Sequence, residues 1–321
     1  MKRIVSLSLA VCVWITACQA ESTPVPTNPP SVQFFPIPIT TPLPDTAAVP
    51  SPTRPSKPDT TTTPPIAPTS TPKTIIKTPA LNPSAWKDLP VIPSVIDPTL
   101  SKVYERGLSL GNDPHAFSIF GDCQTRPAEF FGVFESDSLL IESLPLELQE
   151  TVNYFKGSFT RESPTSQDGT TPGALLWTQW HRGQYGCTFA ETPVECELRV
   201  HRPSFVIIQV GTHFESRNTE YLRKVINQLL DEGVVPILAT KGDNREKDER
   251  INRDMAMLAA EYDLPLWNFW AALSDLPDRG LYTRDDRPLQ GPIYLTEEAA
   301  IRHRMTGLAA LNAVWRAVTG E

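Results

Sequence analysis

The chain has 321 residues, and its 37 acidic and 29 basic side chains give a formal net charge of −8 at pH 7. This charge argues against nucleic acid or an anionic membrane surface as a partner. More than half of its 33 prolines lie between residues 21 and 84, so this part of the chain is not available to build a hydrophobic core.

Residues 1–17 have the composition of a secretory signal peptide. Lys2 and Arg3 precede an apolar run that is too short to span a bilayer, and small residues follow it. The sequence Ile-Thr-Ala-Cys, which ends at Cys18, resembles a bacterial lipobox. This resemblance implies cleavage before Cys18 and acylation of its thiol, although an ordinary signal peptide with an incidental cysteine is an alternative. We expect a lipid anchor on the outer face of a bacterial membrane.

Residues 18–85 are predicted to be a tether. The stretch from Glu21 to Ser84 is rich in Pro, Thr and Ser and lacks apolar periodicity, so it cannot bury enough surface to fold. Proline stiffens such a segment toward an extended conformation, which makes it a spacer between the anchor and a domain. The remaining residues, 86–321, have the length of one ordinary domain.

The five cysteines differ in position and in expected role. Cys12 leaves with the signal peptide, and Cys18 carries the lipid. Outside the membrane, the spacing of Cys187 and Cys196 predicts a local disulfide. A zinc site is the alternative, but no second pair of ligands accompanies these two residues. Cys123 remains as a free thiol, either a small buried hydrophobe or, because it follows Gly-Asp at a strand end, a site residue.

Predicted strands alternate with predicted helices along the domain. We predict helices over 100–110, 146–155, 219–230, 246–262 and 296–318, with helical or irregular segments over 127–134 and 174–180. Strands are predicted over 116–120, 204–210, 234–239 and 264–268, with a weaker strand over 156–161. This alternation predicts a three-layer α/β fold with a mainly parallel, doubly wound sheet of five strands in the flavodoxin-like order. Ligands of such sheets bind at the carboxyl ends of the strands.

The segment from Ala116 to Thr125 combines a strand with a possible nucleophile. It reads Ala-Phe-Ser-Ile-Phe-Gly-Asp-Cys-Gln-Thr, an apolar run that ends in a tight turn. Here the sequence resembles the SGNH/GDSL hydrolase superfamily, whose first block reads Gly-Asp-Ser, and Cys123 stands at the position of the serine. The resemblance extends to about Val318. It implies an SGNH-type fold and ester hydrolysis by a nucleophile, a glycine amide, an asparagine and an Asp-x-x-His pair.

The resemblance assigns two further positions around this nucleophile. The glycine whose amide binds the oxyanion falls on Gly173, with Gly169 as the second choice, and the amide of Cys123 is another donor. The asparagine block reads Gly-Thr-His-Phe here, so His213 replaces the asparagine. His213 either serves as the base of a Cys–His dyad, or donates to an oxyanion, or is a hydrogen-bonded residue without a catalytic role.

The Asp-x-x-His pair is replaced in this chain. Gly291 and Tyr294 stand at its two positions and supply neither a carboxylate nor an imidazole. Asp285 and Asp286 lie upstream, but at the wrong offset. His303 lies a few turns into the last helix, where we expect a surface position.

Two other groups of residues are candidates for the site. Asp243 follows the predicted strand 234–239 and either orients His213 or caps a turn. Four tryptophans either line a carbohydrate-facing cleft or pack in the core, namely Trp177, Trp180, Trp267 and Trp270.

These replacements leave two functions open. One is a surface-anchored esterase that removes acyl groups from glycans or small esters through Cys123. The other is a catalytically inactive SGNH-fold module that binds extracellular polysaccharide or a protein partner. Fold resemblance alone does not separate them. We expect no cofactor and no metal for either function, and contact with the membrane only through the lipid.

Overall fold

The computed structural model describes residues 82–321. The predicted signal peptide, the lipidation site at Cys18 and nearly all of the predicted tether lie outside these residues. Within the described part, no helix has both the length and the apolar character needed to cross a bilayer.

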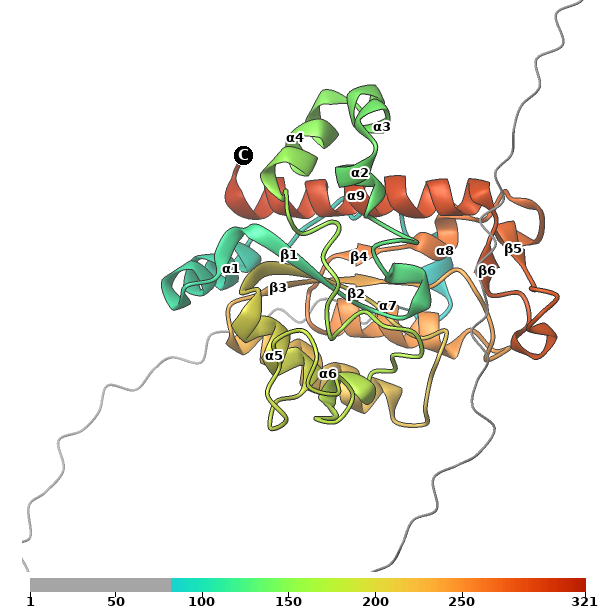
Figure 1. The fold of residues 1–321 in the computed structure, drawn as a ribbon. Helices are drawn as coiled ribbons and strands as arrows, with labels where there is room; N and C mark the ends of the chain where they lie inside the picture. The colour runs from blue at the N-terminus through green and yellow to red at the C-terminus, as the bar shows by residue number, and fades with distance from the viewer. Residues whose placement is uncertain (1–81) are drawn as a thin grey trace, which may run out of the picture. The chain divides into compact units, whose positions relative to one another are not determined.

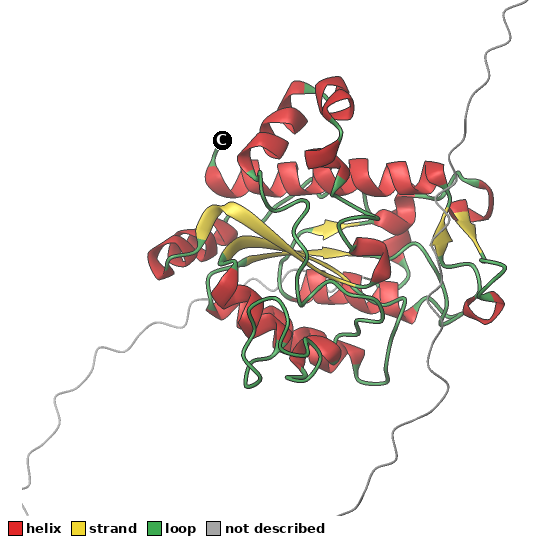
Figure 2. Ribbon diagram, in the orientation of Figure 1, coloured by secondary structure: helices red, strands yellow, loops and turns green. Residues whose placement is uncertain are grey.

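A parallel sheet of four strands forms the centre of the domain. Its order is β1-β2-β3-β4, with bounds Asp113–Gly121, Pro203–Gln209, Val235–Ala239 and Leu266–Trp267. Figure 2 shows these strands between two groups of helices. Every residue of β2 and β3 is buried, which confirms the prediction from their continuous apolar runs.

Helices cover both faces of this sheet, which gives the predicted three-layer α/β arrangement (Figure 1). On one face, α9 (Glu297–Thr319) packs against α1 (Thr99–Leu110) and α4 (Leu146–Tyr154). The other face carries α5 (Pro193–Val200), α6 (Asn218–Asp231) and α7 (Arg250–Glu261). The four longest helices agree with the sequence prediction, but α7 begins at Arg250 rather than at residue 246.

Several short elements complete the described chain. The short helices are α2 (Val133–Ser136), α3 (Ser138–Ser143) and α8 (Phe269–Ala272), and a small hairpin pairs β5 (Leu281–Tyr282) with β6 (Tyr294–Leu295). Single 3₁₀ turns lie at Ala85–Asp88, Cys123–Thr125, Ala174–Leu176, Pro277–Gly280 and Pro288–Gln290. The sequence did not predict α3, α5 or the hairpin, and the expected helix over 174–180 is only the turn Ala174–Leu176.

The prediction of a fifth strand over 156–161 is wrong. These residues form turns, because the Glu135 carboxylate accepts hydrogen bonds from the amides of Gly157 and Phe159 and from the hydroxyl of Thr160. A strand would have paired those amides with β1.

The chain nevertheless reaches the free edge of β1 a few residues later. Gly121 pairs with Ser166 through a single parallel bridge, and its amide donates to the Thr165 carbonyl at 2.9 Å. The carboxyl end of β1 therefore has a neighbour on each side, the bridge at Ser166 and strand β2, and the chain crosses from one side of β1 to the other between them. Such a switch point is where open α/β sheets bind ligands.

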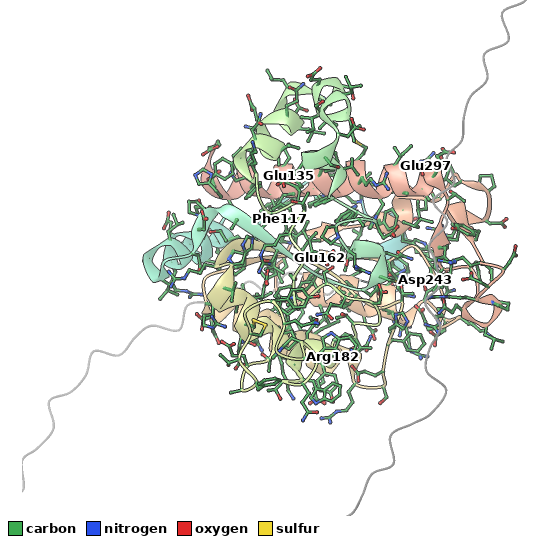
Figure 3. The ribbon with its side chains drawn as sticks, viewed as in Figure 1. Phe117, Glu135, Glu162, Arg182, Asp243 and Glu297 are labelled. Atoms are coloured by element: carbon green, nitrogen blue, oxygen red, sulfur yellow. A yellow bond between two sulfur atoms is a disulfide. The ribbon has the colours of Figure 1, made fainter. Side chains whose placement is uncertain are left out.

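An aromatic core lies beneath helix α9. Phe117 of β1, labelled in Figure 3, meets Phe131, Phe155 and Phe159 edge-on at ring distances of 5.8, 5.5 and 4.9 Å. All four side chains are buried. Edge-to-face pairs of this kind add to the stabilisation that apolar burial provides.

His303 of α9 belongs to this core, so its predicted surface position is wrong. Its ring is fully buried, stacks on Phe130 at 4.2 Å and lies tilted against Phe269 at 4.4 Å. Its Nε2 atom lies 2.6 Å from the Oε1 atom of Gln209. Burial lowers the pKa of His303 to about 3, so the neutral imidazole donates to Gln209 and takes no part in the candidate site.

Cys187 and Cys196 form the predicted disulfide. Cys196 lies within α5 and not in a loop. This helix begins with a capping box between Thr192 and Glu195, and Pro193 occupies its first turn. The bridge ties the preceding loop to α5.

Replacing both Cys187 and Cys196 with alanine is expected to lower the free energy of unfolding by about 2–3 kcal/mol, because the bridge restricts the unfolded chain. The two cysteines are separated by 9 positions, a short loop to close. Urea denaturation without reductant measures the change. Cys123→Ala is the control for loss of a thiol, and a double variant as stable as the wild type would contradict the expectation.

Candidate functional site

The turn after β1 requires its glycine. A Cβ atom on Gly121 would lie 2.0 Å from the Oγ1 atom of Thr125, so no larger residue fits without moving the turn. Asp122 follows and caps the 3₁₀ turn, its carboxylate accepting from the Gln124 amide at 3.3 Å. This local structure fixes the position of Cys123, which is unpaired and only partly exposed.

Cys123 opens into a cavity of about 280 Å³, which we call the Cys123 cavity. Its wall is formed by the turn after β1, by Asp168 and by the β5–β6 hairpin. Tyr282 and Tyr294 pair across this hairpin with their rings 5.8 Å apart. The structure thus places Tyr294, at the histidine position of the hydrolase pattern, in the same cavity as Cys123.

The surroundings of Cys123 disfavour a thiolate. Burial, and after it the repulsion of the carboxylates of Asp122, Asp168 and Asp243, raise the pKa of this thiol to about 12. Reactive cysteines need the opposite environment, in which a nearby positive charge stabilises the thiolate. Cys123 therefore carries its proton at neutral pH.

His213 does not complete a dyad with Cys123. No hydrogen bond among residues 82–321 joins the two side chains, and the buried Nδ1 atom of His213 has no partner there. Burial lowers the pKa of His213, and Arg245 lowers it further, against the opposing effect of Asp243 and Asp168. His213 is also not among the residues that line the Cys123 cavity.

The amide assigned to the oxyanion is already occupied. The Gly173 amide donates to the Oε1 atom of Glu215 at 2.7 Å, so it already has an acceptor within this chain. Sequence reasoning missed Glu215, whose only signal is an acidic residue shortly after His213. Gly169, the second choice, is a turn residue with a φ of 81°.

The hairpin loop where the resemblance would place the Asp-x-x-His pair contains other polar contacts. The hydroxyl of Tyr294 donates to the Oε1 atom of Gln290, and the guanidinium of Arg284 lies over the Tyr294 ring at 5.3 Å. Gly291 has φ 74° and ψ −170°, a conformation that residues with a side chain rarely adopt. An aspartate at this position would strain the backbone.

The remaining candidates do not line the Cys123 cavity. Asp285 and Asp286 are exposed on the hairpin loop, where Asp286 pairs with Arg284 at 2.8 Å. Of the tryptophans, Trp267 and Trp270 are buried and Trp177 is exposed. Trp180 lines a separate cavity of about 290 Å³, which shares Arg126 and Asp168 with the Cys123 cavity.

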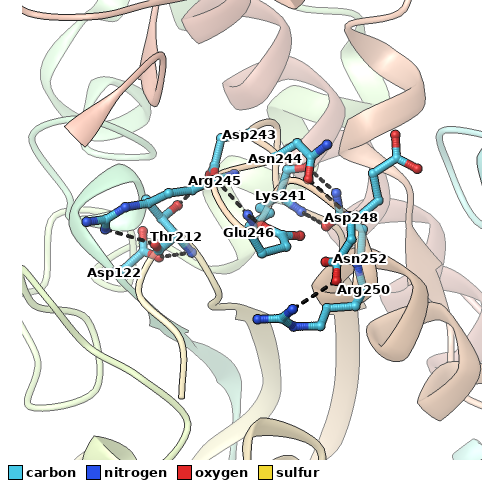
Figure 4. Close-up of polar contacts among 11 residues, drawn as sticks. Asp122, Thr212, Lys241, Asp243, Asn244, Arg245, Glu246, Asp248, Arg250 and Asn252 are labelled. Atoms are coloured by element: carbon cyan, nitrogen blue, oxygen red, sulfur yellow. Dashed lines mark hydrogen bonds and ion pairs between the residues drawn. The ribbon is translucent and has the colours of Figure 1, made fainter. Parts of the chain in front are cut away.

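A buried chain of polar contacts joins the ends of three strands beneath this site (Figure 4). The Thr212 amide, after β2, donates to the Oδ2 atom of Asp122 at 3.2 Å. The Thr212 hydroxyl donates to the Oδ2 atom of Asp243, after β3, at 2.7 Å. Asp122 and Asp243 are almost completely buried.

Lys241 neutralises part of this buried negative charge. Its Nζ atom lies 2.7 Å from Asp243 and 2.6 Å from Glu246, and all three side chains are buried. Asn252 of α7 fixes the backbone of Lys241 through hydrogen bonds of 2.8 and 3.0 Å. Both oxygens of Asp243 are thus bound within this chain, and neither binds His213. No local pattern in the sequence pairs Lys241 with Asp243 or Glu246, because these contacts depend on the fold.

No family model matches this chain. A comparison with curated proteins likewise finds no match. Among residues 82–321, no group of three or more His, Cys, Asp or Glu side chains is arranged to hold a metal ion.

Asp122 gives the site a pH dependence that can be measured. Burial and then the charge of Asp243 raise its pKa, the amides of Gln124 and Thr212 and the charge of Lys241 lower it, and the net value is about 6. The folded state therefore binds a proton more tightly than the unfolded chain, and this contribution to stability is lost as the pH rises from about 4 to about 6.

Asp122→Asn removes this titration. Because each pKa unit corresponds to about 1.4 kcal/mol, the unfolding free energy of the wild type relative to the variant should fall by on the order of 3 kcal/mol between pH 4 and pH 7. Urea unfolding of both proteins at several pH values gives this difference, in which contributions common to both cancel. A difference that is constant, or that rises with pH, would refute the assignment.

Proposed function

We propose that this chain is a catalytically inactive, SGNH-like module that binds a carbohydrate in the Cys123 cavity. The observation that carries the proposal is the environment of Cys123, a protonated thiol beside buried carboxylates with no hydrogen bond to a base. Such a residue shapes a cavity but does not attack an ester.

The arrangement of the blocks supports the SGNH-like part of this proposal. Cys123, Thr212 and Asp243 follow β1, β2 and β3 at the same edge of the sheet, and Tyr294 reaches the cavity from the last hairpin. The four-stranded sheet is compatible with a flavodoxin-like layout in which the fifth strand is reduced to the bridge at Ser166.

A Cys123-dependent esterase has less support. Such an enzyme needs a thiolate or a base, a free oxyanion donor and an orienting acid. Here the thiol is protonated, the Gly173 amide is bound by Glu215, and Asp243 is bound by Thr212 and Lys241.

The lining of the cavity favours carbohydrate over an apolar ligand. Tyr282 and Tyr294 provide aromatic rings with hydroxyl groups, and Arg284 and Arg287 provide donors on the same wall. Aromatic rings beside fixed polar groups suit the mixed surface of a sugar. With the predicted anchor and tether, the module would hold a polysaccharide outside the membrane.

The absence of catalysis can be tested with short acyl esters. We expect the full-length chain to hydrolyse 4-nitrophenyl acetate no faster than Cys123→Ala, because the thiol is not ionised at neutral pH. Initial rates at pH 7 and pH 8 measure this. Turnover that disappears in Cys123→Ala would establish the esterase instead.

Carbohydrate binding is tested by applying the full-length chain and its variants to an array of bacterial polysaccharide fragments. Tyr294→Ala is expected to weaken the binding of any retained glycan by about tenfold, since it removes one ring of the cavity. Tyr221→Ala on α6, outside the cavity, is the matched control. Equal effects of the two substitutions would exclude the Cys123 cavity as the site.

A further inference from the structure

A second and larger cavity adjoins the first at Tyr282, which lines both. Its volume is about 1000 Å³, within the range of sites that hold extended ligands. The loop after β3 forms one wall with Arg245 and Lys247, while Trp270 and Arg279 lie among the residues that line the rest. We call this cavity the Arg279 groove.

Arg279 is held in a fixed orientation within the groove. Its guanidinium lies over the ring of Trp270 at 3.6 Å, and its Nη2 atom donates to the Trp270 carbonyl. The Trp270 ring in turn packs against Trp86 at 5.7 Å. Asp278 and Arg279 have φ values of 48° and 56°, a conformation that costs energy for residues other than glycine and that the surrounding structure must maintain.

The charge of Arg279 lacks a counterion. No ion pair among residues 82–321 includes Arg279, and its buried Nε atom has no hydrogen-bond partner there. Burial lowers the pKa of Arg279, and the nearby Glu249, which has the opposite effect, forms an ion pair with Lys87. A partly desolvated cation without a partner gains from contact with an anion.

The rest of the lining is also positive. Arg245 donates to the Thr212 carbonyl, and Lys247 forms no ion pair within the described residues. Three basic side chains thus face one acidic side chain, Asp278, in the lining of the groove. The whole chain has a net charge of −8, so this local excess of positive charge is a property of the groove and not of the protein.

We infer that the Arg279 groove binds the acid groups of an anionic oligosaccharide whose neighbouring sugars enter the Cys123 cavity past Tyr282. This inference rests on the proposed function and specifies its ligand class. The planar guanidinium offers paired donors to a carboxylate or a phosphate, and its stacking on Trp270 fixes their direction. The volume of the groove fits several sugars and not only a single ion.

Calorimetric titration of the full-length chain tests this inference with three probes. They are a hexamer of galacturonic acid, its fully methyl-esterified form and an oligomer of glycerol phosphate. We expect the chain to bind at least one of the two anionic probes and to bind the uncharged ester at least about tenfold more weakly. The two anionic probes separate a carboxylate ligand from a phosphate ligand.

The variants Arg279→Gln and Lys247→Gln should each weaken anion binding by about tenfold, because each removes one charged donor. Lys247 is exposed, so its replacement keeps the inference testable if Arg279→Gln does not fold. Lys102→Gln is the matched control. It removes one positive charge from α1, which Figure 1 shows at the opposite end of the domain from the β5–β6 hairpin.

The outcomes separate this inference from the proposed function. Failure to bind either anionic probe, or equal binding of the methyl ester, would overturn the inference, and so would equal effects of Lys247→Gln and Lys102→Gln. Binding of the ester that depends on Tyr294 would leave the proposed function standing alone. Anion binding that depends on Lys247 and Arg279 but not on Tyr294 would support the groove and remove the Cys123 cavity from the site.

Discussion

The carboxylate of Asp122 is the contact on which the functional edge of the sheet depends. It binds the Thr212 amide after β2, and Thr212 binds Asp243 after β3, so one buried chain fixes three loops relative to one another. Lys241 compensates part of the charge. Breaking such a buried chain at one member leaves an uncompensated charge or an unpaired polar group. These buried contacts therefore hold the loops after β1, β2 and β3 in fixed positions relative to one another.

The Asp122 carboxylate also disfavours ionisation of the neighbouring Cys123 thiol. Asp122 must be placed beside Cys123 to cap the turn, and its charge raises the pKa of that thiol together with burial. A hydroxyl nucleophile activated by a base would be less sensitive to this field than a cysteine, which must become a thiolate. Tyr294, which shares the cavity, is not a base that could take the proton of this thiol at neutral pH. The carboxylate that stabilises this turn therefore also disfavours the thiolate that a cysteine nucleophile needs.

Local sequence patterns predicted those parts of the domain that depend on local chemistry. The apolar runs gave β2 and β3, the cysteine spacing gave the disulfide, and Gly-Asp-Cys marked the end of β1. The predictions that were wrong depend on contacts between residues that lie far apart in the sequence. His303 is buried by Phe130, a residue far away in the chain, and the strand over 156–161 is lost because Glu135 takes its amides. Glu215 reaches Gly173 in the same way, and no local pattern contains such a pairing.

Net charge illustrates how an average conceals a local feature. The value of −8 argues against anionic partners over the whole surface. Charges separated by more than about 8 Å are largely screened at physiological ionic strength, so a ligand in a groove responds mainly to the side chains that line it. Arg279 and Lys247 are in that position, and neither has an ion-pair partner within the described part of the chain. A negative protein can therefore favour an anionic ligand at one place.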